Sequence, residues 1–271
     1  MNNTKDILLQ KMKIYKQMRN YALILLLLSS AFSMFAAYSQ TPQTFETNRV
    51  TVKRYGLALP GRSLDFMYEF VYPTSDALAL PKIREQMLEA FFGWGLPKDK
   101  LKGDFNDQLR IVQTWYEDKV IKNYTDAIPR PDGWPGELCS YNFKTSAIRN
   151  VHNKILVFCI DAQYAYGIAH GRHDCTCVNF DLHTGDKISL QNLFDEANIK
   201  KLDAIVNEVL KSQDNYTVGT IENFIMLPKG IQFVYDEYIA GPYSSGTVRA
   251  TIPLSKFRHL LKDSALTYFK E

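Results

Sequence analysis

Hydrophobic and polar residues alternate over several short stretches of the chain, and elsewhere apolar residues recur at helical spacing. The alternation predicts strands at residues 50–55, 63–72, 138–147, 154–166, 172–182, 224–227, 231–238 and 247–252. The helical spacing predicts helices over residues 81–91, 105–120, 190–194, 199–212 and 255–261. Neighbouring strands are expected to pair as hairpins with helices between the pairs. We therefore predict an α+β fold with a mainly antiparallel sheet and packed helices.

One segment interrupts this pattern. Residues 126–137 (DAIPRPDGWPGE) hold three prolines and two glycines, which disfavour any regular element. We expect a linker there, between an N-terminal subdomain at residues 50–125 and a C-terminal subdomain at residues 138–271. The polar residues 40–49 are expected to form a lead-in.

The first 39 residues follow the three-part pattern of a secretory signal peptide. Five cations precede an apolar stretch from Tyr21 to Ala37, and small residues occupy positions −3 and −1 before Gln40. A membrane-spanning helix needs about 20 apolar residues, whereas this stretch has 17 and includes three serines. We predict cleavage after residue 39, export to the periplasm or the extracellular space, and no membrane span in the mature chain.

The charge changes when this segment is removed. The whole chain has a formal net charge of +3, but residues 1–39 contain five of its 32 cations and one of its 29 acidic residues, so the remainder carries −1. A near-neutral domain lacks the basic surface that nucleic-acid binding requires. We expect no nucleic-acid partner.

A polar cluster, HGRHDCTC at residues 170–177, contains residue types that ligate zinc. However, Cys175 and Cys177 are one residue apart on a predicted strand, which separates their Cβ atoms by about 6.5–7 Å. Structural zinc sites use wider gaps on tight loops, and exported thiols tend to be oxidised. We predict neither a metal site nor a cofactor.

Four cysteines, at positions 139, 159, 175 and 177, allow up to two disulfides. Strand alternation and a hairpin centred on Ile168 place Cys159 opposite Cys177. Cys139 is expected on the other side of the sheet. We predict a Cys159–Cys177 bridge with Cys139 free and buried; the alternative is four reduced, buried cysteines.

No catalytic signature is present: the chain lacks a Gly-x-Ser-x-Gly elbow, a His-Glu-x-x-His pair and a phosphate-binding glycine loop. We assign no catalytic residue. A hydrolase that uses the region of His170, His173 and Asp174 stays an alternative, although neighbouring residues of a strand point to opposite faces. This alternative requires that these side chains converge in a cleft.

The aromatic run from Phe233 to Tyr238, followed by Tyr243, can form either core or a face for stacking sugars or peptides. We expect Phe233 and Tyr235 in the core, and Tyr238 and Tyr243 exposed near a loop. The candidate binding residues are Tyr166, His170, His173, Tyr238 and Tyr243.

Two stretches together resemble a known family. They are YGIAHGRHDCTCVNFDLHTGDKISLQNLF (166–194) and GIQFVYDEYIAGPYSSGTVRATIPLSKFRHLL (230–261). They resemble the exported domain of unknown function shared by RsiV-type anti-sigma factors and the non-catalytic region of PdaC-type peptidoglycan deacetylases. The resemblance is best over residues 138–262, and residues 50–125 look like its companion subdomain.

The resemblance implies an α+β exported domain associated with the cell envelope, which in RsiV-type proteins senses lysozyme. The chain departs from both types, because its first 19 residues are too short for a sigma-binding domain and it has no deacetylase domain. We therefore expect a non-enzymatic envelope domain that binds cell-wall glycan or a secreted protein such as lysozyme. A structural partner in an envelope complex is a further alternative, which a large exposed apolar patch would favour.

Overall fold

The computed structural model describes residues 46–59, 62–76, 79–93, 95–126, 138–165, 171–214 and 218–270. All of them belong to one compact unit, residues 42–271. The predicted signal peptide and most of the lead-in lie outside the described residues, as do residues 127–137 of the predicted linker. Within the described part, no helix combines the length and apolar character needed to cross a membrane.

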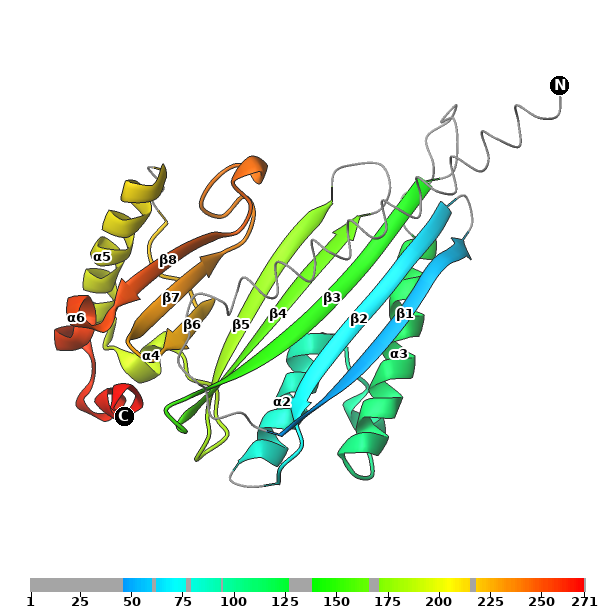
Figure 1. Cartoon of the computed structure of the whole chain (residues 1–271), viewed down its shortest axis with the longest axis horizontal. Coiled ribbons are helices and arrows are strands. Elements are labelled where there is room, and N and C mark those ends of the chain that lie inside the picture. The colour runs from blue at the N-terminus through cyan, green and yellow to red at the C-terminus, as the bar shows by residue number, and fades with distance from the viewer. Residues whose placement is uncertain are drawn as a thin grey trace. The chain divides into compact units, whose positions relative to one another are not determined.

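The compact unit contains a five-stranded sheet, a three-stranded antiparallel sheet and helices that pack on each (Figure 1). The predicted α+β class, the mainly antiparallel pairing and the two-subdomain layout are confirmed. The larger sheet runs in the order β1-β2-β3-β4-β5. Its strands are β1 (Thr47–Leu59), β2 (Arg62–Pro73), β3 (Leu138–Val151), β4 (Ile155–Ala165) and β5 (Arg172–Asp181).

One pair in this sheet is parallel: β2 with β3. Parallel neighbours need a long crossover, usually helical, and here the crossover contains α2 (Leu80–Phe92) and α3 (Phe105–Thr125). Because β2, before the predicted linker, is paired with β3, after it, one sheet contains strands from both predicted subdomains. The change from one sheet to the other comes after β5.

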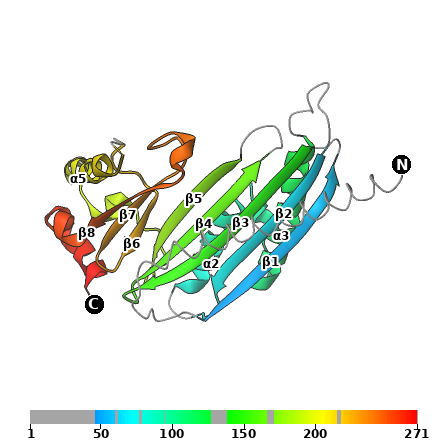
Figure 2. The same cartoon turned by 45° about the horizontal axis from the view of Figure 1, so that its top comes forward.

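Helices α2 and α3 cover one face of the larger sheet (Figures 1 and 2). The apolar face of β2 packs against their predicted stripes and is fully buried at Leu64, Phe66, Tyr68 and Phe70. The ring of Tyr68 lies edge-on to those of Phe92 and Tyr116, each 5.6 Å away between centroids. Because these apolar side chains all pack into one core, they recur with period two along β2 and with helical spacing along α2 and α3, which is the pattern that the sequence shows.

The second sheet consists of β6 (Phe224–Leu227), β7 (Gly230–Tyr235) and β8 (Val248–Pro253), all antiparallel. Helix α5 (Glu196–Asp214) packs with it through Leu202, Val206 and Leu210, which are fully buried members of the predicted stripe. The short helices α4 (Leu190–Leu193) and α6 (Leu254–Phe257) complete this subdomain. The predicted last helix is shorter than expected, since a 3-10 turn follows α6 at Arg258–Leu260.

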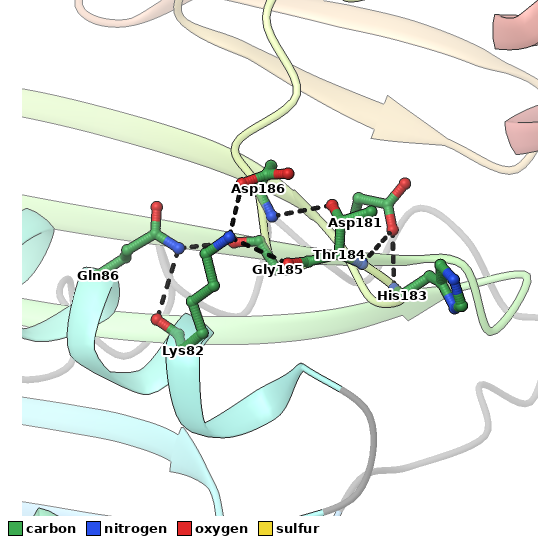
Figure 3. A network of polar contacts seen from close by, with 7 residues as sticks. All are labelled: Lys82, Gln86, Asp181, His183, Thr184, Gly185 and Asp186. Carbon is green, nitrogen blue, oxygen red and sulfur yellow. Dashed lines mark hydrogen bonds and ion pairs between the residues drawn. The ribbon is translucent and has the colours of Figure 1, made fainter.

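The turn after β5 is fastened to α2 (Figure 3). Lys82 Nζ donates to the carbonyl oxygen of Thr184 at 3.1 Å and pairs with Asp186 at 2.7 Å. Gln86 Nε2 donates to the carbonyl oxygen of Gly185 at 2.6 Å. Gly185 has φ +75°, and a Cβ there would lie 2.9 Å from Lys82 Cδ, so both its conformation and its contact require glycine.

Asp181 closes the same turn from within. Its Oδ1 accepts the N–H groups of His183 at 2.7 Å and Thr184 at 3.0 Å (Figure 3). Its Oδ2 accepts the hydroxyl of Tyr268 at 2.6 Å. One carboxylate therefore joins the end of β5 to the C-terminal residues.

Candidate functional site

β5 is the edge strand of the larger sheet, and the smaller sheet lies along that edge (Figure 2). An edge strand leaves every second N–H group without a strand partner. Here side chains of the second subdomain accept them: Glu237 from His173 at 3.2 Å, Asp236 from Cys175 at 2.7 Å and Asn223 from Cys177 at 2.8 Å. The edge is thus closed by side chains and not by another strand.

Asn223 and Asn179 complete the junction. Asn223 Nδ2 also donates to the carbonyl oxygens of Cys175 at 2.6 Å and Val234 at 3.0 Å. Asn179, which is buried, donates to the carbonyl oxygen of Phe224 at 2.8 Å and accepts the N–H of Met226 at 2.9 Å. Each amide imitates a peptide group, so the two sheets are joined through hydrogen bonds in a defined register.

His173 lies at the start of β5 and holds both ends of the loop after β7. We call residues 236–247 the tyrosine loop. The His173 N–H donates to Glu237, and its ring Nδ1 lies 3.2 Å from Thr247 Oγ1. Its Nε2 lies 2.8 Å from Asp161 Oδ2. The hydrogen bond to Asp161 raises the pKa of His173 against the opposing effect of burial.

Two of the predicted binding residues project from the tyrosine loop. Tyr238 is 60% exposed and Tyr243 is 36% exposed, and their ring centroids lie 6.0 Å apart with planes at 35°. Ile239, between them in sequence, is 53% exposed. The predicted exposure of Tyr238 and Tyr243 is confirmed, as is the core position of Phe233 and Tyr235.

Tyr141 on β3 belongs to the same neighbourhood, although the sequence did not single it out. Burial, followed by the nearby Tyr243 and Glu237, raises the pKa of Tyr141. A Cβ on Gly171 would lie 1.8 Å from Tyr141 Oη, so this ring sits directly against the start of β5. The pattern placed Tyr141 on a strand, but no local signal says that this strand face meets the tyrosine loop.

The remaining predicted residues are not brought into one cleft. Tyr166 and His170 lie outside the described residues. His173 and Asp174 point to opposite faces of the sheet: His173 meets Asp161, whereas Asp174 accepts from Tyr164 Oη at 2.9 Å. The convergence that the hydrolase alternative requires is therefore not seen for His173 and Asp174. In the described part of the chain, no three His, Cys, Asp or Glu side chains are grouped to hold a metal ion.

The predicted placement of Cys159 opposite Cys177 is confirmed, because the two residues are paired between the antiparallel strands β4 and β5. The N–H of Cys177 points away from β4, which makes this a non-hydrogen-bonded pair, with Cα atoms about 4.5 Å apart. Such a separation suits a disulfide. Cys159, Cys175 and Cys177 are free thiols in this structure, so the bond stays a prediction; the side chain of Cys139 is not among those described.

Thiol counting on denatured, unreduced protein tests the bond. After oxidative folding, we expect two reactive thiols from the four cysteines. Cys159→Ser should raise the count to three, because it releases Cys177, whereas Cys139→Ser should lower it to one. Four thiols in the unsubstituted protein would show that Cys159 and Cys177 stay reduced.

Comparisons with known proteins find a family similar to part of this chain. Residues 191–255 match a family model described as "Protein of unknown function (DUF3298)". A solved DUF3298 structure from Bacteroides fragilis has a similar fold, with a TM-score of 0.65 and 19% identity over 84% of this chain and 97% of that chain. A second solved DUF3298 structure, from Pseudomonas aeruginosa, has a TM-score of 0.59 and 14% identity over 83% of this chain and 97% of that chain.

No curated protein matches this sequence. At these identities the two structures show a common fold and nothing finer. The matched region begins in α4 and ends in α6, so it includes the smaller sheet and the tyrosine loop. Residues 191–255 of this chain are therefore similar to the DUF3298 family, and the wider fold resembles that of solved members of that family.

Proposed function

We propose that this protein is an exported, non-enzymatic domain of the cell envelope that binds cell-wall glycan through the tyrosine loop. The observation that carries the proposal is the pair of exposed rings, Tyr238 and Tyr243, held 6.0 Å apart on one loop. Aromatic faces that stay exposed in the free protein offer stacking surfaces for the apolar faces of sugar rings.

The backbone supports this reading. Tyr238 has φ +66°, a conformation that costs a non-glycine residue about 1–3 kcal/mol and is concentrated at functional sites. A structural role alone would be served better by glycine at this position. Strain retained under an exposed aromatic ring is therefore an argument for recognition.

The anchoring of the loop also favours binding. Glu237, which immediately precedes Tyr238, is 9% exposed and accepts the His173 N–H. Thr247 contacts the His173 ring at the other end of the loop. A loop that is ordered before the ligand arrives loses less conformational entropy on binding.

The envelope location rests on the predicted signal peptide and on the resemblance to RsiV-type and PdaC-type domains. That resemblance also makes a secreted protein such as lysozyme the second candidate ligand. An envelope hydrolase has less support, since His173 is engaged by Asp161 and Asp174 lies on the other face of the sheet. The third alternative, a structural partner in a complex, would have to use the same loop, because the exposed large apolar side chains of the described residues are Tyr55 and three on the tyrosine loop, Tyr238, Ile239 and Tyr243.

The test is a pull-down of purified residues 42–271, the compact unit, on insoluble peptidoglycan and on immobilised lysozyme. We expect saturable binding to peptidoglycan. Tyr243→Ala should weaken it about tenfold, which corresponds to about 1.4 kcal/mol for a lost stacking ring. Tyr238→Gly should weaken binding similarly without lowering the unfolding temperature, because glycine tolerates the positive φ.

Tyr55→Ala is the matched control, since Tyr55 is 43% exposed but lies on β1. His170→Ala, measured in the same pull-down, tests whether the predicted binding residue His170 also contributes to binding. Equal weakening by Tyr55→Ala would count against the tyrosine loop as the site. Binding to lysozyme alone would replace glycan with a protein ligand, and binding to neither would overturn the proposal.

A further inference from the structure

A pocket of about 220 Å³ lies on the helix-covered face of the larger sheet, between α2, α3 and strands β3 to β5. Its polar lining comes from Asn142, Lys144, Tyr164, Asp174 and Thr176. His173 and the tyrosine loop contact the opposite face of the sheet, so this pocket is a separate feature.

Strand register explains how the pocket forms. Lys144 on β3 is paired with Ala162 on β4, and Ala162 is paired with Asp174 on β5. The three residues thus form one row across the sheet, with the smallest side chain in the middle. Two strand spacings separate the backbones of Lys144 and Asp174 by about 9.5 Å. Two opposite charges therefore face a common space whose floor is a methyl group.

Lys144 is held in place but is not neutralised. Its Nζ donates to the carbonyl oxygen of Phe91, near the end of α2, and lies 5.0 Å from the centre of the Phe91 ring. Burial, then the repulsion of Lys119, lowers the pKa of Lys144 to about 8, and the negative charge of Asp174 across the pocket opposes this only in part. Within the described chain no carboxylate lies within ion-pair distance of Lys144. An anion entering the pocket would supply the missing countercharge.

Asp174 forms the opposite wall. Its Oδ2 accepts from Tyr164 Oη at 2.9 Å, and its Oδ1 forms an ion pair with Arg172 Nε at 2.8 Å, which fixes its orientation. The side chain of Arg172 is 60% exposed, so this pair is screened by solvent. A carboxylate can accept about four hydrogen bonds, so it can still receive donors from a ligand. In the described part, the side chains of Asn142 and Thr176 make no hydrogen bond, which leaves them available to the same ligand.

We propose that this pocket binds a small α-amino acid, with its carboxylate at Lys144 and its ammonium group at Asp174. The volume suits a ligand of this size, and the row Lys144–Ala162–Asp174 presents the two complementary charges across one gap. A ligand with only one of these groups would satisfy only one wall. The inference is independent of glycan binding, which uses the other face of the sheet.

The experiment is calorimetric titration of residues 42–271 with alanine and with two analogues that each lack one of its charged groups. Alaninamide lacks the carboxylate, and propionate lacks the ammonium group. We expect saturable binding of alanine and at least about tenfold weaker binding of each analogue. Lys144→Met should remove the preference for alanine over alaninamide, and Asp174→Asn should remove the preference over propionate.

Two further variants separate binding from folding, because Lys144 also contacts the end of α2. Ala162→Leu keeps both charges but fills the floor of the pocket, so it should abolish alanine binding while the unfolding temperature holds. Lys122→Met, at an exposed lysine of α3, should bind alanine like the unsubstituted protein. Absence of saturable binding at about 10 mM alanine, or an unchanged ligand preference in Lys144→Met, would overturn the proposal.

Discussion

Replacing Asn179 with leucine is expected to lower the free energy of unfolding by about 4 kcal/mol. Leucine has the same number and branching of side-chain heavy atoms, so no cavity is created, but the carbonyl oxygen of Phe224 and the N–H of Met226 lose their partner. Asn179 is 2% exposed, and water cannot replace the amide there. Each buried unpaired backbone group costs about 1–3 kcal/mol.

Urea unfolding of residues 42–271 measures this loss as a lower transition midpoint with an unchanged slope. Asn198→Leu is the matched control, because its amide donates to one backbone group, the carbonyl oxygen of Leu260, and accepts only from the exposed Lys201 side chain, which water can replace. We expect a loss of about 1 kcal/mol for Asn198→Leu. If both variants lose the same free energy, the Asn179 amide does not join the two sheets.

His173→Gln is expected to lower the free energy of unfolding by about 2 kcal/mol at pH 5.5. The side chain of Asp161 is 5% exposed, and its Oδ1 already lacks a hydrogen-bond partner. Without the imidazole, its carboxylate loses its ion-pair partner, and breaking one side of a buried pair is costly. Partial exposure of His173 keeps the effect below the value for a fully buried pair.

The effect should depend on pH in a defined direction. The hydrogen bond to Asp161 raises the pKa of His173 above 6.5, so the folded state binds a proton more tightly than the unfolded state. The stabilisation is complete below the unfolded pKa near 6.5 and is lost as pH rises through the folded pKa. The difference between the unsubstituted protein and His173→Gln should thus be larger at pH 5.5 than at pH 9.

Thermal unfolding at both pH values tests this dependence. Asp161→Asn should remove most of the pH-dependent part in the presence of His173, because the carboxylate that makes the largest contribution to the raised pKa of His173 is gone and only the weaker effects of Cys175 and Glu237 remain. His183→Gln, at an exposed position of the turn after β5, should change little. A loss from His173→Gln that is equal at both pH values would show that the imidazole acts by packing alone.

The sequence by itself determined those features that depend on near neighbours in the chain. Period-two alternation set the buried face of β2, and helical spacing set the stripe of α5. Aspartate is a favoured residue at the start of a helix, and Asp104 caps α3, since its Oδ1 accepts the N–H of Asp107 at 3.0 Å. The pairing of Cys159 with Cys177 was also predictable from the sequence. In a hairpin the position of the turn determines which residues of the two adjacent strands are paired.

The exposure of Tyr238 and Tyr243 was also predictable, since the alternation of β7 ends where turn-forming residues begin. The sequence could not show that their loop is held by His173, or that Tyr141 lies beside it. Each of these contacts joins residues more than 60 positions apart. The sequence periodicity that predicts strands and helices does not show which distant residue a polar side chain will contact.

Only the tertiary structure decided how the strands beyond the hairpins are arranged. The parallel pairing of β2 with β3 depends on where α2 and α3 pack, not on either strand alone. The closure of the β5 edge depends on Asn179 and Asn223, which look like ordinary polar residues in the chain. The row Lys144–Ala162–Asp174 exists because two registers coincide. Charge and burial at a site are properties of that assembled surface, so local sequence could not reveal them.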